Sequence, residues 1–172
     1  MIAPALASGL AAEIEKRLKR SGLDIPVGVS NRHCHLTREH FKILFGPRAE
    51  PKRIKSIKQP GFYAAEETID ILGPKGVLKK IRLVGPYRSH TQIELARTDA
   101  LVLGVNAPVR ESGDVNGSSG AVLVGPAGRV EIKEGVILAQ RHLHFSPGEA
   151  ENLGVASGEL VRVRAGTGRG RS

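Results

Sequence analysis

The sequence predicts a mainly β fold, of the barrel or sandwich type, with a few short helices. Its 21 glycines and 10 prolines, several of them in Gly-Pro pairs, mark frequent tight turns. Between these turns the apolar residues fall into short runs of strand length. The 172 residues suffice for one large domain or two small ones with a buried core.

The chain begins with a predicted amphipathic helix, which we assign to an N-terminal segment of residues 1–23. Apolar residues recur at spacings of four within residues 4–20, at Leu6, Leu10, Ile14 and Leu18, and Gly22 supplies a stop signal. Such a narrow apolar stripe can dock on its own domain or on a partner protein.

Short strands are predicted for most of the remaining chain. They cover Ile25–Ser30, Thr68–Leu72, Val77–Val84, Ala121–Val124, Arg129–Ile132 and Glu159–Arg164. Gly-Pro-x-Gly turns at residues 73–76 and 125–128 join four of these strands into two hairpins of the same pattern. Residues 47–60 are basic and rich in turn formers, so we expect a loop there. Residues 166–172 lack apolar side chains and are expected to be disordered.

Capping signals predict two further helices. Thr37 precedes a helix over residues 38–45. Ser146 and Glu149 form a capping box before a second short helix, which Gly154 ends.

Each of these two helices follows an Arg-His-x-His segment, Arg32–His35 in the first case and Arg141–His144 in the second. Side chains two residues apart in a strand point to the same face, so each segment can present two imidazoles together. Imidazole is the commonest metal ligand among side chains. We interpret the repeated unit as an internal duplication and predict a metal site built from two related halves.

Composition and charge limit the classes of function. The single cysteine excludes an internal disulfide framework and fits a reducing compartment. No signal peptide or apolar run of membrane-spanning length is present, so a cytoplasmic protein is expected. The net charge of +9 suits nucleic acid or a phosphorylated small molecule such as coenzyme A. Scarce aromatic residues and the lack of a nucleic-acid motif favour the small molecule.

Five segments carry a specific resemblance, in the same order along the chain. They are Val29–Leu36, Gln59–Thr68, Leu83–Arg88, Ala107–Asp114 and Ala139–His144. Together they resemble the phosphate propanoyltransferase family, the phosphotransacylases of bacterial microcompartments. That family interconverts an acyl-CoA plus phosphate with an acyl phosphate plus CoA.

The resemblance implies two small β-barrels with capping helices, here over residues 24–135 and 136–165, and two zinc ions bound between them. By motif position the implied zinc ligands are His33, His35, Glu94, His142 and His144. Arg88 lies where the family places its phosphate-binding arginine. The family also implies a short acyl group, a homodimer and a location inside a microcompartment, where the N-terminal segment could contact shell or core proteins.

One departure from the family concerns the C-terminus. Family members usually continue to a His-containing, acid-rich motif that supplies a further zinc ligand. This chain ends at Ser172 without such a motif. We therefore expect an incomplete second barrel and one weakened zinc ion, which puts full activity in question.

The residues around the implied ligands have their own expected roles. Cys34 lies between two histidines and would point to the opposite face as a small buried residue. Gln92 would share a strand face with Glu94, and Ser112 lies in a polar loop, so both are substrate-binding candidates. Arg32 would anchor the backbone or a neighbouring carboxylate.

These parts predict a phosphate acyltransferase with a zinc Lewis acid, in which Arg88 holds phosphate for direct attack on the thioester. No protein nucleophile is required for this reaction. Two alternatives stay open: a metal-dependent hydrolase, and a zinc-binding scaffold with impaired catalysis. Zinc content together with assays in phosphate and in water alone would separate the three.

Overall fold

The computed structural model describes residues 12–16, 18–20, 25, 28, 32–57 and 59–163. The chain divides into a barrel unit, Gly28–His142, and a terminal unit made of Met1–Val27 and Leu143–Ser172. The predictions for residues 4–11, the stop at Gly22, most of the strand over residues 25–30 and the tail over 166–172 lie outside the described residues.

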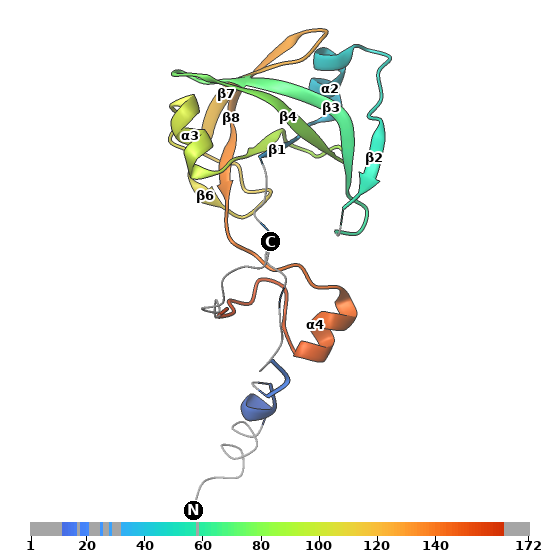
Figure 1. Cartoon of the computed structure of the whole chain (residues 1–172), viewed down its shortest axis with the longest axis vertical. Coiled ribbons are helices and arrows are strands. Elements are labelled where there is room, and N and C mark those ends of the chain that lie inside the picture. The colour runs from blue at the N-terminus through green and yellow to red at the C-terminus, as the bar shows by residue number, and fades with distance from the viewer. Residues whose placement is uncertain are drawn as a thin grey trace, which may run out of the picture. The chain divides into compact units, whose positions relative to one another are not determined.

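Six strands of the barrel unit close into a ring (Figure 1), which confirms the mainly β fold. They are β1 (His33–His35), β3 (Tyr63–Leu72), β4 (Val77–Gly85), β5 (Gln92–Glu94), β7 (Ser119–Val124) and β8 (Arg129–Ala139). The ring runs β3–β4–β1–β5–β8–β7 and returns to β3 through the antiparallel pair of β3 and β7. Two short strands extend it: β2 (Arg53–Ser56) pairs with β3, and β6 (Val109–Arg110) pairs with β8.

Two helices accompany the barrel, α2 (Arg38–Phe45) and α3 (Arg97–Leu103). Helix α2 has the predicted bounds, because the Thr37 hydroxyl accepts a hydrogen bond from the His40 N–H at 3.1 Å and Gly46 ends the helix. Its Phe41 and Leu44 are buried in the core. Helix α3 was not predicted from the sequence.

The barrel unit consists of two halves with the same order of elements. Strand β1, helix α2 and the β3–β4 hairpin are followed by β5, α3 and the β7–β8 hairpin. In both halves the first strand pairs in parallel with the last one, and β1 pairs antiparallel with β5 between the halves. The barrel unit therefore has an approximate twofold relation, with β1 and β5 side by side at its centre.

Each hairpin turn is seated on the helix of the opposite half. The Lys75 N–H in the β3–β4 turn donates to the Leu103 carbonyl of α3 at 2.9 Å, and the Ala127 N–H in the β7–β8 turn donates to the Leu44 carbonyl of α2 at 2.9 Å. A Cβ atom on Gly73 would collide with that same Leu103 carbonyl oxygen. The Gly-Pro-x-Gly pattern thus serves close backbone approach as well as the turn.

One loop prediction and one strand prediction were wrong. The loop expected over residues 47–60 contains β2, whose four residues are all exposed. The strand expected over Glu159–Arg164 is not formed in its described part, where Leu160 is 89% exposed. Among the described residues after β8, the second predicted barrel is represented by helix α4 (Pro147–Leu153) and by no strand.

Helix α4 of the terminal unit confirms the predicted capping box. The Ser146 hydroxyl accepts from the Glu149 N–H, and Gly154 ends the helix in the left-handed conformation. Arg20, in a helical stretch over residues 18–20, donates to the carbonyls of Leu153 and Gly154 at 2.9 and 2.7 Å. These bonds satisfy carbonyl groups that the helix end leaves unpaired. No helix in the described part of the chain is long and apolar enough to cross a membrane.

Candidate metal centre

The candidate site lies on β1 and β5, at the centre of the approximate twofold relation. In their antiparallel register His33 faces Glu94 and His35 faces Gln92. All four side chains therefore lie on one face of the two strands. Cys34 is fully buried and belongs to the hydrophobic core on the other face, as predicted. Burial raises the pKa of its thiol, so Cys34 is an unreactive packing residue.

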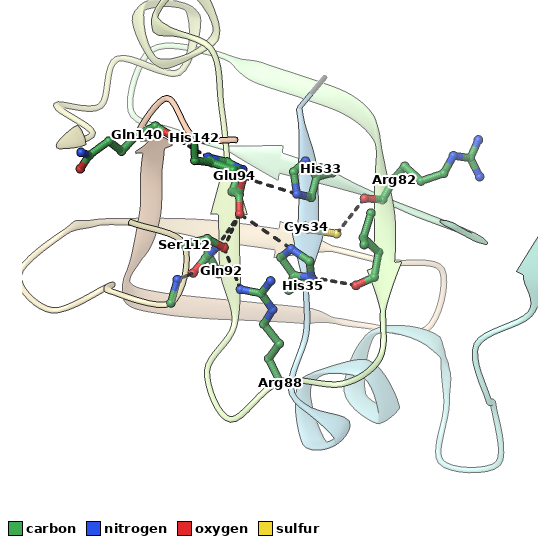
Figure 2. Close-up of polar contacts among 12 residues, drawn as sticks. His33, Cys34, His35, Arg82, Arg88, Gln92, Glu94, Ser112, Gln140 and His142 are labelled. Carbon is green, nitrogen blue, oxygen red and sulfur yellow. Dashed lines mark hydrogen bonds and ion pairs between the residues drawn. The ribbon is translucent and has the colours of Figure 1, made fainter. Parts of the chain in front are cut away.

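Two imidazoles and one carboxylate converge on this face (Figure 2). The His33 Nε2 atom lies 3.5 Å from Glu94 Oε2, and the His35 Nε2 atom lies 3.8 Å from Glu94 Oε1. One ligand atom from each residue lies within 4.8 Å of the others. The two imidazole rings are 5.0 Å apart and almost perpendicular, at 84°. This spacing suits three protein ligands around one divalent ion.

The protonation state of His35 follows from its contacts. Its Nδ1 atom lies 2.9 Å from the Val84 carbonyl oxygen, which can only accept, so Nδ1 carries a hydrogen. Burial, with the charges of Arg88 and His33, lowers the pKa of His35 to about 4, although Glu94 and Val84 oppose the shift. The neutral ring therefore directs the lone pair of Nε2 toward the carboxylate, as metal ligation requires.

Glu94 is buried in a network of hydrogen bonds. Its Oε1 atom accepts from the Ser112 hydroxyl at 2.8 Å and from the Gln92 amide at 2.7 Å. Burial alone would raise the pKa of Glu94, but the His33 charge, the hydrogen bond from Ser112 and the charge of Arg88 oppose the burial effect and lower the pKa. The carboxylate is therefore held ionised, which is the form that binds metal.

Arg88 brings a cation to the edge of this group. Its Nη1 atom donates to the Ser112 hydroxyl at 3.0 Å, and its guanidinium lies 5.6 Å from the centre of the Phe62 ring. Its backbone N–H donates to the Leu36 carbonyl at 3.0 Å, which ties the loop after β4 to the end of β1. Within the described part of the chain Arg88 forms no ion pair with a carboxylate, so its charge is available for an anion.

The predicted site residues fall into two sets. The structure brings together His33, His35, Arg88, Gln92, Glu94 and Ser112. His142 and His144 are both exposed and are not members of the three-residue group found among the described residues. The His142 Nδ1 atom lies 2.6 Å from the Gln140 carbonyl oxygen, while His144 belongs to the terminal unit. Their role as zinc ligands stays a prediction.

Three features of the site were not identified from the sequence. Phe62 lies edge-on to His35, with ring centres 6.4 Å apart, and also under Arg88. The backbone N–H of Gly113 donates to the Gln92 side-chain oxygen at 2.7 Å. The third is the Val84 carbonyl. Backbone groups carry no sequence signal, whereas Phe62 lies in a segment that the resemblance had marked. As predicted, Arg32 binds a neighbouring carboxylate, that of Asp99, at 2.8 Å.

The donor set fits a borderline divalent ion such as Zn²⁺. Two neutral nitrogens and one carboxylate oxygen are the protein ligands of a catalytic zinc site, which keeps a further position open. The Nε2 atoms of the two histidines lie 3.5 and 3.8 Å from the oxygens of the buried Glu94 carboxylate. These distances are longer than ordinary hydrogen bonds, so short hydrogen bonds among the three side chains do not explain the arrangement.

Comparisons with known proteins agree on one family. The sequence model of the family phosphate propanoyltransferase matches residues 26–172. A phosphate propanoyltransferase of Thermotoga maritima is 49% identical over 147 residues, which are 86% of this chain and 70% of the relative. Those of Rhodopseudomonas palustris and Salmonella typhimurium are 49% and 50% identical, over 85% and 81% of this chain and 65% and 66% of their own lengths. The chain is thus similar to about two thirds of each relative.

Proposed function

Since the chain belongs to the phosphate propanoyltransferase family, a family of transferases, we propose that it interconverts a short acyl-CoA plus phosphate with an acyl phosphate plus CoA. One observation carries the proposal: the group of His33, His35 and Glu94 lies next to a cation, Arg88, to which Ser112 links it. A cation that can bind phosphate and a group that can bind a metal ion are therefore adjacent, which supports a role in acyl transfer to phosphate.

Arg88 is the phosphate-binding residue in this proposal. Its planar guanidinium can donate two parallel hydrogen bonds to phosphate oxygens. The Phe62 ring supports one face of the guanidinium, and the backbone bond to Leu36 fixes the loop that carries it. A phosphate held in this way presents a third oxygen to the thioester, and fixing the two reactants lowers the entropic part of the barrier.

The reaction is a direct transfer. The phosphate oxygen forms a bond with the carbonyl carbon of the thioester, and the carbon–sulfur bond breaks to release the CoA thiolate. No protein nucleophile is needed in this proposal, because the phosphate oxygen itself attacks the carbonyl carbon. An acylated protein detected by mass spectrometry during turnover would contradict this route.

His33, His35 and Glu94 would hold the Zn²⁺ ion. Bound there, zinc would supply a Lewis acid for the thioester carbonyl and a partner for the departing thiolate. His142 and His144 are further proposed zinc ligands, on the resemblance alone. The Val84 carbonyl fixes the tautomer of His35, and Gln92 with Ser112 fixes the orientation of Glu94.

The partners of the protein follow from the same proposal. The substrates are acyl-CoA, CoA and phosphate, and the net charge of +9 favours binding of the CoA phosphates. We also propose a homodimer and a location inside a bacterial microcompartment, with residues 1–23 as the segment that contacts shell or core proteins. Deleting residues 1–20 should then abolish encapsulation and leave acyl transfer intact.

Metal analysis combined with an activity assay tests the main proposal. The purified chain should contain one or two zinc ions, and it should form acyl phosphate from acetyl-CoA only when phosphate is supplied. The His35→Ala variant should lose both zinc and activity, while the exposed His90→Ala variant keeps both. Thiol release in water alone would instead identify a hydrolase, and bound zinc without turnover would identify a scaffold.

A further inference from the structure

The Ser112 hydroxyl is shared between the anion-binding and the metal-binding groups of the site (Figure 2). It lies 3.0 Å from Arg88 Nη1, 3.0 Å from the Gln92 amide nitrogen and 2.8 Å from Glu94 Oε1. No other hydroxyl among the described residues forms hydrogen bonds with both Arg88 and Glu94. Ser112 is therefore the one direct polar link between these two groups in the described chain.

The direction of every hydrogen bond at this link is determined. A guanidinium can only donate, so Ser112 accepts from Arg88. The Gly113 N–H donates to the Gln92 side-chain oxygen, which fixes the amide so that its nitrogen also donates to Ser112. The single Ser112 hydrogen is then left for Glu94 Oε1.

This arrangement makes the two oxygens of Glu94 unequal. Oε1 accepts two hydrogen bonds, one from Ser112 and one from Gln92. Oε2 faces the Nε2 atom of His33 at 3.5 Å. Glu94 can thereby offer Oε2 to a metal ion as a single-oxygen ligand, while Oε1 stays hydrogen-bonded to Ser112.

We propose that Ser112 is a positioning residue that couples anion binding at Arg88 to metal binding at Glu94. The inference rests on the proposed function, which supplies the anion and the metal. An anion at Arg88 forms charge-assisted bonds that a neutral hydroxyl cannot match, so Arg88 turns from Ser112 to the anion. Without this incoming bond Ser112 donates less strongly to Glu94, whose carboxylate then becomes a better ligand. Anion and metal should therefore each strengthen the binding of the other, by the same factor.

Direct attraction between the metal and the anion would also couple their binding, but it does not need Ser112. The part that passes through the hydroxyl can be isolated by removing only the hydroxyl. Ser112 is exposed, so its replacement by alanine leaves no cavity in the core, and its replacement by threonine keeps the hydroxyl. Ser89, next to Arg88 in sequence and bonded to His90, is the matched control.

The experiment measures the dissociation constant of Zn²⁺ by competition with a chromogenic chelator, with and without sulfate as the tetrahedral dianion. In the unmodified chain sulfate should tighten zinc binding severalfold. Ser112→Ala should remove at least half of the sulfate effect on a logarithmic scale, because the alanine variant has no hydroxyl to link Arg88 to Glu94. Ser112→Thr and Ser89→Ala should keep the sulfate effect, and thermal unfolding should confirm that all variants fold.

The outcomes separate this inference from the proposed function. If the unmodified chain binds no zinc, both the metal centre and the coupling are wrong. If zinc binds but sulfate has no effect, or if Ser112→Ala keeps the full sulfate effect, the coupling through Ser112 is wrong and the metal centre stands.

Discussion

Replacing Gln92 by leucine tests whether the buried network stabilises the fold, independently of any ligand. Gln92 is 1% exposed, and leucine fills nearly the same volume without polar atoms. The change removes a bond of 2.7 Å to an ionised carboxylate, which contributes about 2 kcal/mol, and leaves the Gly113 N–H without its partner, at about 1 kcal/mol. Water can reach the exposed Gly113 in part. We therefore expect a loss of about 2.5 kcal/mol, or a fall in Tm of about 5–10 °C.

Thermal unfolding of the metal-free protein, followed by far-ultraviolet circular dichroism, measures this loss. Gln140→Leu is the control, because the same substitution there affects an exposed side chain and should shift Tm by less than about 2 °C. If Gln92→Leu unfolds within about 2 °C of the unmodified chain, the network around Glu94 does not stabilise the barrel, and our assignment of its hydrogen bonds is wrong.

Three further predictions concern other parts of the molecule. Arg88→Lys should raise the KM for phosphate about tenfold without changing Tm, because lysine cannot form two parallel bonds; steady-state kinetics with an unchanged KM would contradict the assigned role. Gly73→Ala should destabilise the barrel by more than about 2 kcal/mol, because the added Cβ atom would collide with a helix carbonyl. Gly148→Ala, whose Cβ atom would meet no neighbour within 4 Å, should not destabilise the protein. Urea unfolding measures the free energy of unfolding of both variants. Hydrogen bonds from the Ala156 N–H and from Lys16 and Arg20 lower the pKa of Glu159 to about 2. The stabilisation that Glu159 contributes should therefore be full above pH 4.5 and be lost as the pH falls toward 2. An NMR titration that places the pKa of this carboxyl group near 4.5 would refute these contacts.

Local signals predicted the helices that carry their own caps. Thr37 and Ser146 each accept a hydrogen bond from the first helical turn, so α2 and α4 could be identified from residue type alone. Helix α3 follows Ala96, which has no side-chain acceptor, and its cap is instead a bond from the Ala96 N–H to Asp99. Its run of small and apolar residues gave no clear period, so the sequence did not reveal it.

The strand predictions depended on whether one face of the strand is buried. The hairpins β3–β4 and β7–β8 alternate between buried and exposed residues, and their Gly-Pro-x-Gly turns marked their ends. Strand β2 is exposed along its whole length and so lacks that alternation. The segment from Glu159 also alternates between apolar and polar residues, but Leu160 is exposed in the described chain. The alternation without a buried face therefore led to a wrong strand prediction.

The ligand group was predictable only in part, for a similar reason. The spacing of His33 and His35 implies a shared face in any fold that makes this segment a strand. Glu94 needed the resemblance, because nothing local says that β5 will pair with β1 in the register that places it opposite His33. The network of Gln92, Ser112 and Gly113 depends on where a loop folds back, which no residue pattern encodes.

The seating of each turn on the opposite helix means that neither half of the barrel can close without the other. In a ring assembled from two identical chains, matching places would have to carry the same residue. Here the matching places hold different ones: His33 corresponds to Gln92, and His35 corresponds to Glu94. Joining both copies in a single polypeptide lifts the demand for sameness, so that one copy can specialise in neutral nitrogen donors and the other in an anionic oxygen with its supporting amide.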